Sequence, residues 1–145
     1  MHYAAALIDL AARRPGDRLT TPACGTSDIA VLYPRRRPDA AVTTLCDWLN
    51  GFTRAVLPAG GKPTGTLRDQ AVILPMHSAR GLQFRIVLLL WTDLLPSPFK
   101  NRNDAIDRGL FYVSMTRVED MLVILHSGSS SYVKELYRAL GTVPQ

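Results

Sequence analysis

A polar insert between two apolar runs carries side chains suited to binding chemistry. It holds His77, Ser78, Arg80 and Gln83, and the chain on either side of it is almost continuously apolar. Imidazole, hydroxyl, guanidinium and amide groups donate to or accept from phosphate, ribose and base edges. From these residues alone, the insert is either a ligand-binding edge of a sheet or a well-capped turn with one incidental histidine.

A second candidate is the pair of arginines in the amphipathic stretch that starts near residue 105. Arg108 and Tyr112 share one side of the expected helix, Gly109 permits close approach of another element, and Arg117 lies at the C-terminal end. A planar, permanently charged fork at that place suits a transferring phosphoryl group. It is equally a favourable cation at a helix C-terminus, so these residues leave both interpretations open.

Two other kinds of active site are disfavoured. Ser78 adjoins His77, but neighbouring residues on an extended segment point apart, and no acidic residue can be identified to orient the histidine. His2, His77 and His126 show no ligand spacing and no thiol stands near them, so the sequence predicts no metal site.

The glycine-rich stretch at 57–68 is not a phosphate-binding P-loop. Its Gly61-Lys62 is followed by Pro63 in place of Ser or Thr, and no glycine stands five residues before Gly61. The two cysteines, Cys24 and Cys46, have no paired spacing, which is typical of ordinary thiols in a reducing compartment.

Apolar runs of strand length alternate with stretches of helical periodicity. Such alternation implies parallel crossovers, and therefore a three-layer α/β domain with a mainly parallel sheet flanked by helices. The nearly continuous apolar strands indicate a sheet covered on both faces. The expected strands are 29–33, 71–74, 84–91 and 121–125, and the expected helices are 2–14, 39 to about 56, 104 to about 118 and 129–140.

Apolar spacing also predicts which helical residues face the sheet. Asp39 is the expected N-cap of a helix whose apolar face continues to Val56. In the next two helices Ile106 and Leu140 are expected to point inward, with Leu110, because they continue the apolar stripes. We expect residues 1–27 to form a helix and loop at the edge of a domain that comprises residues 28–145.

The formal net charge of +5 favours anionic partners, with nucleic acid first among them. Three arginines at 35–37 follow an expected strand, where ligands bind in open α/β sheets; a solvated charged turn is the alternative. No apolar run approaches the roughly 18 residues that a membrane span needs. The N-terminus also lacks a signal-peptide pattern, so a cytoplasmic protein without a membrane partner is expected.

Two stretches resemble paired motifs of UvrD/Rep-type superfamily 1 DNA helicases. The family patterns are roughly T-x-H-x-x-K-G-L-E followed by Phe or Trp, and later E-E-x-R-L-x-Y-V-A-x-T-R-A. This chain has P-M-H-S-A-R-G-L-Q-F at 75–84 and A-I-D-R-G-L-F-Y-V-S-M-T-R-V at 105–118. The run D-I-A-V-L-Y at 28–33 is similar to the strand that opens the family's second motor domain. The resemblance therefore implies a RecA-like fold of the P-loop NTPase type.

The resemblance implies a nucleotide-binding role for four residues. Arg117 would be the catalytic arginine finger that reaches the ATP γ-phosphate from the second motor domain. Gln83 stands where the family usually has a glutamate that contacts the nucleotide sugar. Gly81 would let the backbone approach the nucleotide. Tyr112 is expected beside the nucleotide cleft.

The same resemblance implies a grip on single-stranded DNA. His77 would lie towards the DNA, Arg80 matches the usual lysine, and Ser78 between them is assigned to the same group. The chain departs from the pattern at Pro75, which lacks the usual threonine hydroxyl, and at Gln83, which lacks the usual charge. The double acid of the second motif is reduced to Asp107.

No G-x-x-x-x-G-K-S/T loop and no acidic Mg²⁺ motif occur in the chain, although both belong to the family's first motor domain. ATP, with Mg²⁺ held by that other domain, is the expected cofactor, and a P-loop-containing domain in the same longer protein or in trans is the expected partner. Alone, the chain is expected to lack ATPase activity. The alternatives are a non-enzymatic nucleic-acid-binding or interaction module, and an unrelated α/β nucleotide-binding protein.

Overall fold

The computed structural model describes residues 29–34, 39–51, 55–56, 71–96 and 103–141. Three expected features lie outside these residues: the helix at 2–14, the basic turn at 35–37 and the loop at 57–68. The proposed boundary near residue 28 also lies there, so the division into two regions stays a prediction.

In the described residues, five parallel strands form one sheet in the order β2-β3-β1-β4-β5. The first strand of the described chain, β1, is at the centre, between β3 and β4. The strands are β1 (Ile29–Tyr33), β2 (Ala55–Val56), β3 (Ala71–Pro75), β4 (Phe84–Leu89) and β5 (Val118–Ile124). Because all pairings are parallel, each connection must return from the C-terminal end of one strand to the N-terminal end of the next.

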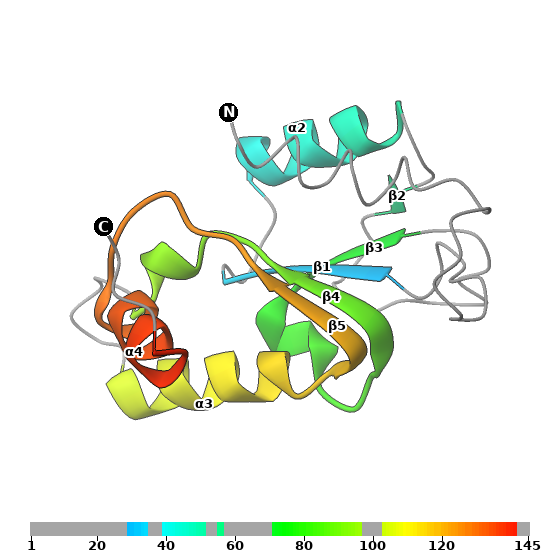
Figure 1. Ribbon diagram of the computed structural model, residues 1–145. Helices are drawn as coiled ribbons and strands as arrows, with labels where there is room; N and C mark the ends of the chain where they lie inside the picture. The colour runs from blue at the N-terminus through cyan, green and yellow to red at the C-terminus, as the bar shows by residue number, and fades with distance from the viewer. Residues whose placement is uncertain (1–28, 35–38, 52–54, 57–70, 97–102, 142–145) are drawn as a thin grey trace.

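Helices cover both faces of this sheet (Figure 1). Helix α2 (Ala40–Leu49) lies on one face, and α3 (Asp104–Met115) and α4 (Ser131–Ala139) lie on the other. Two short 3₁₀ helices, η3 (Met76–Ala79) and η4 (Thr92–Leu94), follow β3 and β4. This arrangement confirms the predicted α/β class with a parallel sheet between helical layers.

Neighbouring residues of the central strands enter different core layers. Leu89 joins the cluster under α3 and α4, whereas Leu88 joins the cluster under α2, and both are at most 1% exposed. A strand residue and its neighbour point to opposite faces, so apolar residues must occupy successive positions when both faces are covered. The nearly continuous apolar runs of the sequence have this cause.

Helix α2 begins as predicted and ends earlier than predicted. The Asp39 carboxylate accepts from the backbone N–H groups of Ala41 and Val42, which caps the helix. At the other end, the Asn50 side chain donates to the Cys46 carbonyl and accepts from the Ala55 N–H. Asn50 thus turns the chain into β2, and the prediction that the helix continues to Val56 was wrong.

Two apolar residues that were expected inside are exposed. The inward stripe of α3 consists of Asp107, Leu110, Phe111 and Ser114. Ile106 precedes that stripe by one position, about 100° around the helix, and is 64% exposed. Leu140 is 75% exposed because it is the C-cap of α4, beyond the buried first turn of that helix.

The limits of two strands also differ from the expected ones. Strand β4 ends at Leu89 because Trp91 adopts a left-handed backbone conformation with φ of 51°. Strand β5 begins at Val118, directly after the turn that follows α3, and not at Met121. The strand was predicted to begin later because Glu119 and Asp120 interrupt the apolar run. An edge strand, however, need not be apolar.

Candidate functional site

The polar insert runs from the C-terminal end of β3 to the N-terminal end of β4, and thus from one end of the strands to the other. Pro75 pairs with Tyr33 at the C-terminal end of β1, whereas Ile86 pairs with Ile29 at its N-terminal end. Residues 76–83 therefore cross over β1 from the C-terminal edge to the N-terminal edge, on the face that α3 covers. This crossover separates His77 and Ser78 at its start from Gln83 at its end, so the three do not form one group at a single edge.

The start of the crossover presents polar side chains outward. Met76 and Ala79 of η3 are fully buried in the core, three residues apart. Between them His77 is exposed and Ser78 is half-buried, and Arg80 directly after them is exposed. The apolar pair thus anchors the short helix and orients its polar residues away from the core.

A glycine turn ends the crossover. Gly81 has a φ of +78°, and a Cβ placed on it would meet no atom within 4 Å. Its backbone conformation, and not lack of space, is therefore what favours glycine. The Leu82 N–H closes the turn on the Ala79 carbonyl at 3.2 Å, and the following Gln83 is exposed.

The structure brings Gln83 and Arg117 to the same edge. Phe84 and Val118 are partners at the N-terminal ends of β4 and β5, and each follows one of the two residues. The Phe84 N–H donates to the Arg117 carbonyl at 2.8 Å. Sequence positions that are far apart thus become neighbours at the beginning of two parallel strands.

Within the part of the chain that the structure describes, the Arg117 guanidinium contacts neutral acceptors. Its Nε donates to the Val113 carbonyl at 3.0 Å and its Nη2 to the Thr116 hydroxyl at 3.1 Å, while Nη1 lies 3.5 Å from the Leu82 carbonyl. No carboxylate among the described residues forms an ion pair with it. A half-buried cation held in this way can still accept an anionic partner such as a phosphate group.

Tyr112 lies one turn before the end of α3, and its side chain is 63% exposed. Its carbonyl accepts the Thr116 N–H at 3.1 Å. The nearby helical Gly109 has open space where a Cβ would lie. This outer side of α3 therefore offers an aromatic ring and close approach to the backbone, beside the edge that holds Arg117.

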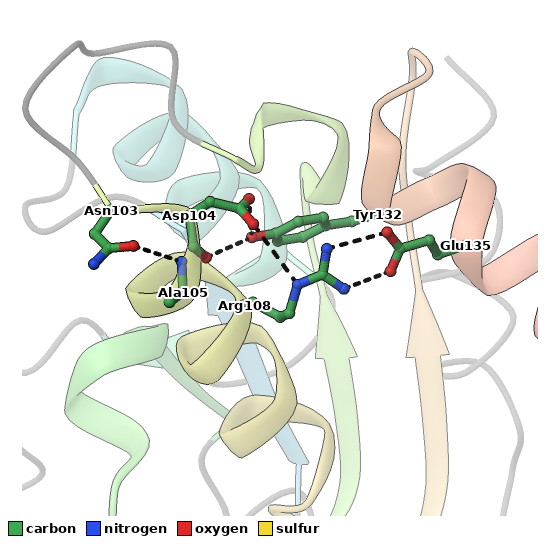
Figure 2. Close-up of polar contacts among 6 residues, drawn as sticks. All are labelled: Asn103, Asp104, Ala105, Arg108, Tyr132 and Glu135. Atoms are coloured by element: carbon green, nitrogen blue, oxygen red, sulfur yellow. Dashed lines mark hydrogen bonds and ion pairs between the residues drawn. The ribbon is translucent and has the colours of Figure 1, made fainter.

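Arg108 lies away from that edge and is bound to α4. Its guanidinium forms two hydrogen bonds with the Glu135 carboxylate and lies over the Tyr132 ring (Figure 2). Neither Tyr132 nor Glu135 was predicted from the sequence. Their spacing on one side of α4 was visible, but nothing local to that helix identifies an arginine of α3 as the partner.

The described residues contain no group of three or more His, Cys, Asp or Glu side chains that could hold a metal ion. Cys46 is a free, buried thiol, and Cys24 lies outside the described residues. None of the described helices has the length and the apolar character needed to cross a membrane.

Comparisons with known proteins agree with this architecture. The chain matches the model of the UvrD-like helicase C-terminal domain over residues 49–129, which is more than half of its length. Its fold is similar to the C-terminal domain of a possible DNA helicase from Lactobacillus plantarum WCFS1, with a TM-score of 0.54 and 20% sequence identity. That match covers 78% of this chain and 65% of the other. No curated protein matches the chain. The chain belongs to the UvrD-like helicase C-terminal domain family.

Proposed function

We propose that this chain is the C-terminal motor domain of an ATP-dependent DNA helicase or translocase. The observation that carries the proposal is the position of Arg117. It stands beside Gln83 at the end of the sheet where the strands begin, and the groups that its guanidinium contacts among the described residues are all neutral. In this function Arg117 is the arginine finger that stabilises the charge on the transferring γ-phosphoryl group of ATP.

Three further residues fit a nucleotide at this edge. The exposed Gln83 amide would hydrogen-bond the ribose, and the turn at Gly81 would let the backbone approach the nucleotide. The exposed Tyr112 ring would pack beside it. The phosphate cradle and the ligands of Mg²⁺ would come from a P-loop domain, since the chain contains no Walker-type loop. ATP would then lie between the two domains.

Single-stranded DNA would bind at the start of the crossover. The exposed His77 and Arg80 and the half-buried Ser78 offer donors for phosphate and base edges there. The net charge of +5 favours this polyanion. Closure of the cleft around ATP would bring Arg117 to the γ-phosphate and change the grip on DNA.

The test of the nucleotide role uses the chain alone and mixed with a P-loop motor domain of a UvrD-type helicase. Alone, the chain should show negligible ATP turnover because it has a finger without a phosphate cradle. In the mixture, Arg117→Ala should lower the DNA-stimulated kcat by a factor of about 10³ or more, as loss of an arginine finger does.

Arg138→Ala provides a matched control, since Arg138 is an exposed arginine of α4 that the proposal does not use. It should leave turnover unchanged. Turnover by the isolated chain that disappears in Arg117→Ala would contradict the proposal. A mixture that binds DNA but never hydrolyses ATP would favour the alternative, a non-enzymatic nucleic-acid-binding module.

The DNA role is tested by binding of a single-stranded oligonucleotide at several salt concentrations. Affinity should fall as salt rises, because each phosphate contact releases counterions. Arg80→Ala should weaken binding to all sequences and reduce the salt slope by about one. Affinity that does not respond to salt, or an unchanged slope in Arg80→Ala, would argue against a phosphate contact at Arg80.

A further inference from the structure

The N-terminal half of α3 is fastened to α4 by a cluster of four side chains, which we call the α3–α4 clamp. Arg108 donates from Nη1 to Glu135 Oε2 at 2.6 Å and from Nη2 to Oε1 at 3.1 Å. Its guanidinium carbon lies 5.0 Å from the centre of the Tyr132 ring. The Tyr132 hydroxyl donates to Asp104 Oδ1 at 2.9 Å (Figure 2). Arg108 thus binds the Glu135 carboxylate and packs on the Tyr132 ring at the same time.

The charges of the clamp stabilise one another. The hydrogen bond from Arg108 lowers the pKa of Glu135 below its ordinary value. The Glu135 hydrogen bond and charge raise the already high pKa of Arg108. Burial, followed by the hydrogen bond to Asp104, raises the pKa of Tyr132 and keeps its hydroxyl protonated as a donor. A forked pair of this geometry fixes orientation as well as distance.

The carboxylates that already contact the Arg108 guanidinium limit what else it can bind. Both terminal nitrogens of its fork are directed at Glu135, and Nε lies 3.8 Å from Asp104 Oδ2. A phosphate group would have to displace these carboxylates. Although Arg108 stands in the same motif as Arg117, the two arginines therefore have different partners and different tasks.

The clamp uses Asp104 and Arg108 in the N-terminal half of α3, and Arg117 follows the C-terminal end of the same helix. A helix of 12 residues such as α3 is about 18 Å long. Its last turn orients Arg117, because the Arg117 Nε and backbone N–H donate to the carbonyls of Val113 and Ser114. Since α4 lies against the other end (Figure 1), a tilt of α3 there would move the guanidinium at this end.

The helix that completes the clamp lies outside the matched family region. That region ends at residue 129, whereas Tyr132 and Glu135 belong to α4 (Ser131–Ala139). The family match therefore says nothing about the role of α4. In the structure, α4 is the element that holds the N-terminal half of α3 through charged side chains.

We infer that Arg108 is a positioning residue: through Glu135 and Tyr132 it fixes α3 on α4 and thereby sets the direction of the Arg117 guanidinium. The inference rests on the proposed function only in assigning Arg117 its task at the γ-phosphate. Small displacements of a reacting group lower the reaction rate by large factors. A contact in the N-terminal half of α3 that positions Arg117 can therefore affect the rate of ATP hydrolysis.

Hydrogen exchange in the full chain, followed by NMR, tests the inference without nucleotide. The protons to follow are the Arg117 Nε–H and the backbone N–H groups of Thr116 and Arg117. In Glu135→Gln, which keeps the size of the side chain, and in Arg108→Ala, these protons should exchange about fivefold faster than in the wild type. The Leu125 N–H, bonded to Leu89 in the sheet, should keep its rate within about twofold.

Asp120→Asn is the matched control, because it weakens the ion pair of Arg85 and Asp120 between β4 and β5 and leaves α3 untouched. It should not change the exchange of the three protons at Thr116 and Arg117. Reversal of the pair in Arg108→Glu with Glu135→Arg should recover part of their protection. Unchanged exchange in Glu135→Gln, or equal acceleration of every amide including that of Leu125, would overturn the inference; Glu135→Gln decides if Arg108→Ala does not fold.

A second measurement separates the two proposals. In the mixture with a P-loop domain, Glu135→Gln should lower kcat about fivefold with little change in the KM for ATP. If Arg117→Ala leaves turnover intact, the proposed function fails whatever the exchange data show. If Arg117 is required but neither the exchange nor kcat responds to Glu135→Gln, only the positioning role fails.

Discussion

At the scale of single residues, two glycines with free space around them place opposite demands on the backbone. Gly81 has a φ of +78° in the turn before β4. Gly109 lies in the interior of α3, where it is exposed and has no atom within 4 Å of the place of a Cβ. A methyl group is sterically harmless at both positions, so the backbone conformation decides the effect of adding one.

We predict opposite signs for the two alanine variants. Gly81→Ala should lower the free energy of unfolding by about 1–2 kcal/mol, because a left-handed conformation is costly for residues with a Cβ. Gly109→Ala should raise it by roughly 0.5–1 kcal/mol, because alanine favours a helix and loses less conformational entropy than glycine. Urea unfolding followed by circular dichroism measures both, and equal signs would contradict this account.

The sequence predicted residues whose partners are local and missed those whose partners are distant. Asp39 was identified as a cap because it bonds N–H groups two and three residues ahead. Arg108 and Glu135 are 27 residues apart and meet only when α3 and α4 pack. Periodicity describes one helix at a time, so it cannot identify such a pair.

At the scale of elements, the α3–α4 clamp makes the contact between two helices sensitive to acid. The pKa of Glu135 is lowered in the folded chain, so the folded state binds the proton less readily than the unfolded chain. The contribution of Glu135 is therefore present above the ordinary carboxyl pKa near 4.5 and is lost as the pH falls below it.

We expect Glu135→Gln to be less stable than the wild type at pH 7, with a difference that shrinks steadily below about pH 4.5. Denaturant unfolding at pH 7, 5, 4 and 3 gives that difference directly. Glu119→Gln is the control, since Glu119 is an exposed carboxylate of β5 outside the clamp. A difference for Glu135→Gln that persists or grows in acid would show that charge is not the source.

Element types were easier to predict than element ends. The four expected strands 29–33, 71–74, 84–91 and 121–125 all exist, but β2 was assigned to a helix because Val56 continues the apolar spacing of α2. The side chain of Asn50 decides that boundary with its two hydrogen bonds. A single side chain that bonds backward and forward carries no periodic signal.

At the scale of the whole molecule, stability depends on two core layers that share one sheet. Leu88 and Leu89 are adjacent in β4, yet each supports a different helical layer. Met121 in the edge strand β5 is 42% exposed and supports neither layer fully.

Leu88→Ala and Leu89→Ala should each lower the free energy of unfolding by about 2–5 kcal/mol, because each leaves a cavity in a filled layer. Met121→Ala should cost about 1 kcal/mol or less, because much of that side chain is already in contact with water. Parallel urea titrations of the three variants measure this. A mild effect at either leucine would mean that its helical layer does not cover the sheet in solution.

The central position of β1 bears on how the chain is synthesised. Its partners β3 and β4 come at residues 71–75 and 84–89, so an apolar strand leaves the ribosome well before any strand that can pair with it. No hairpin can form in a wholly parallel sheet, and the first strand stays exposed to other chains until the later strands are made. It is therefore the segment that we expect to begin aggregation when synthesis stalls.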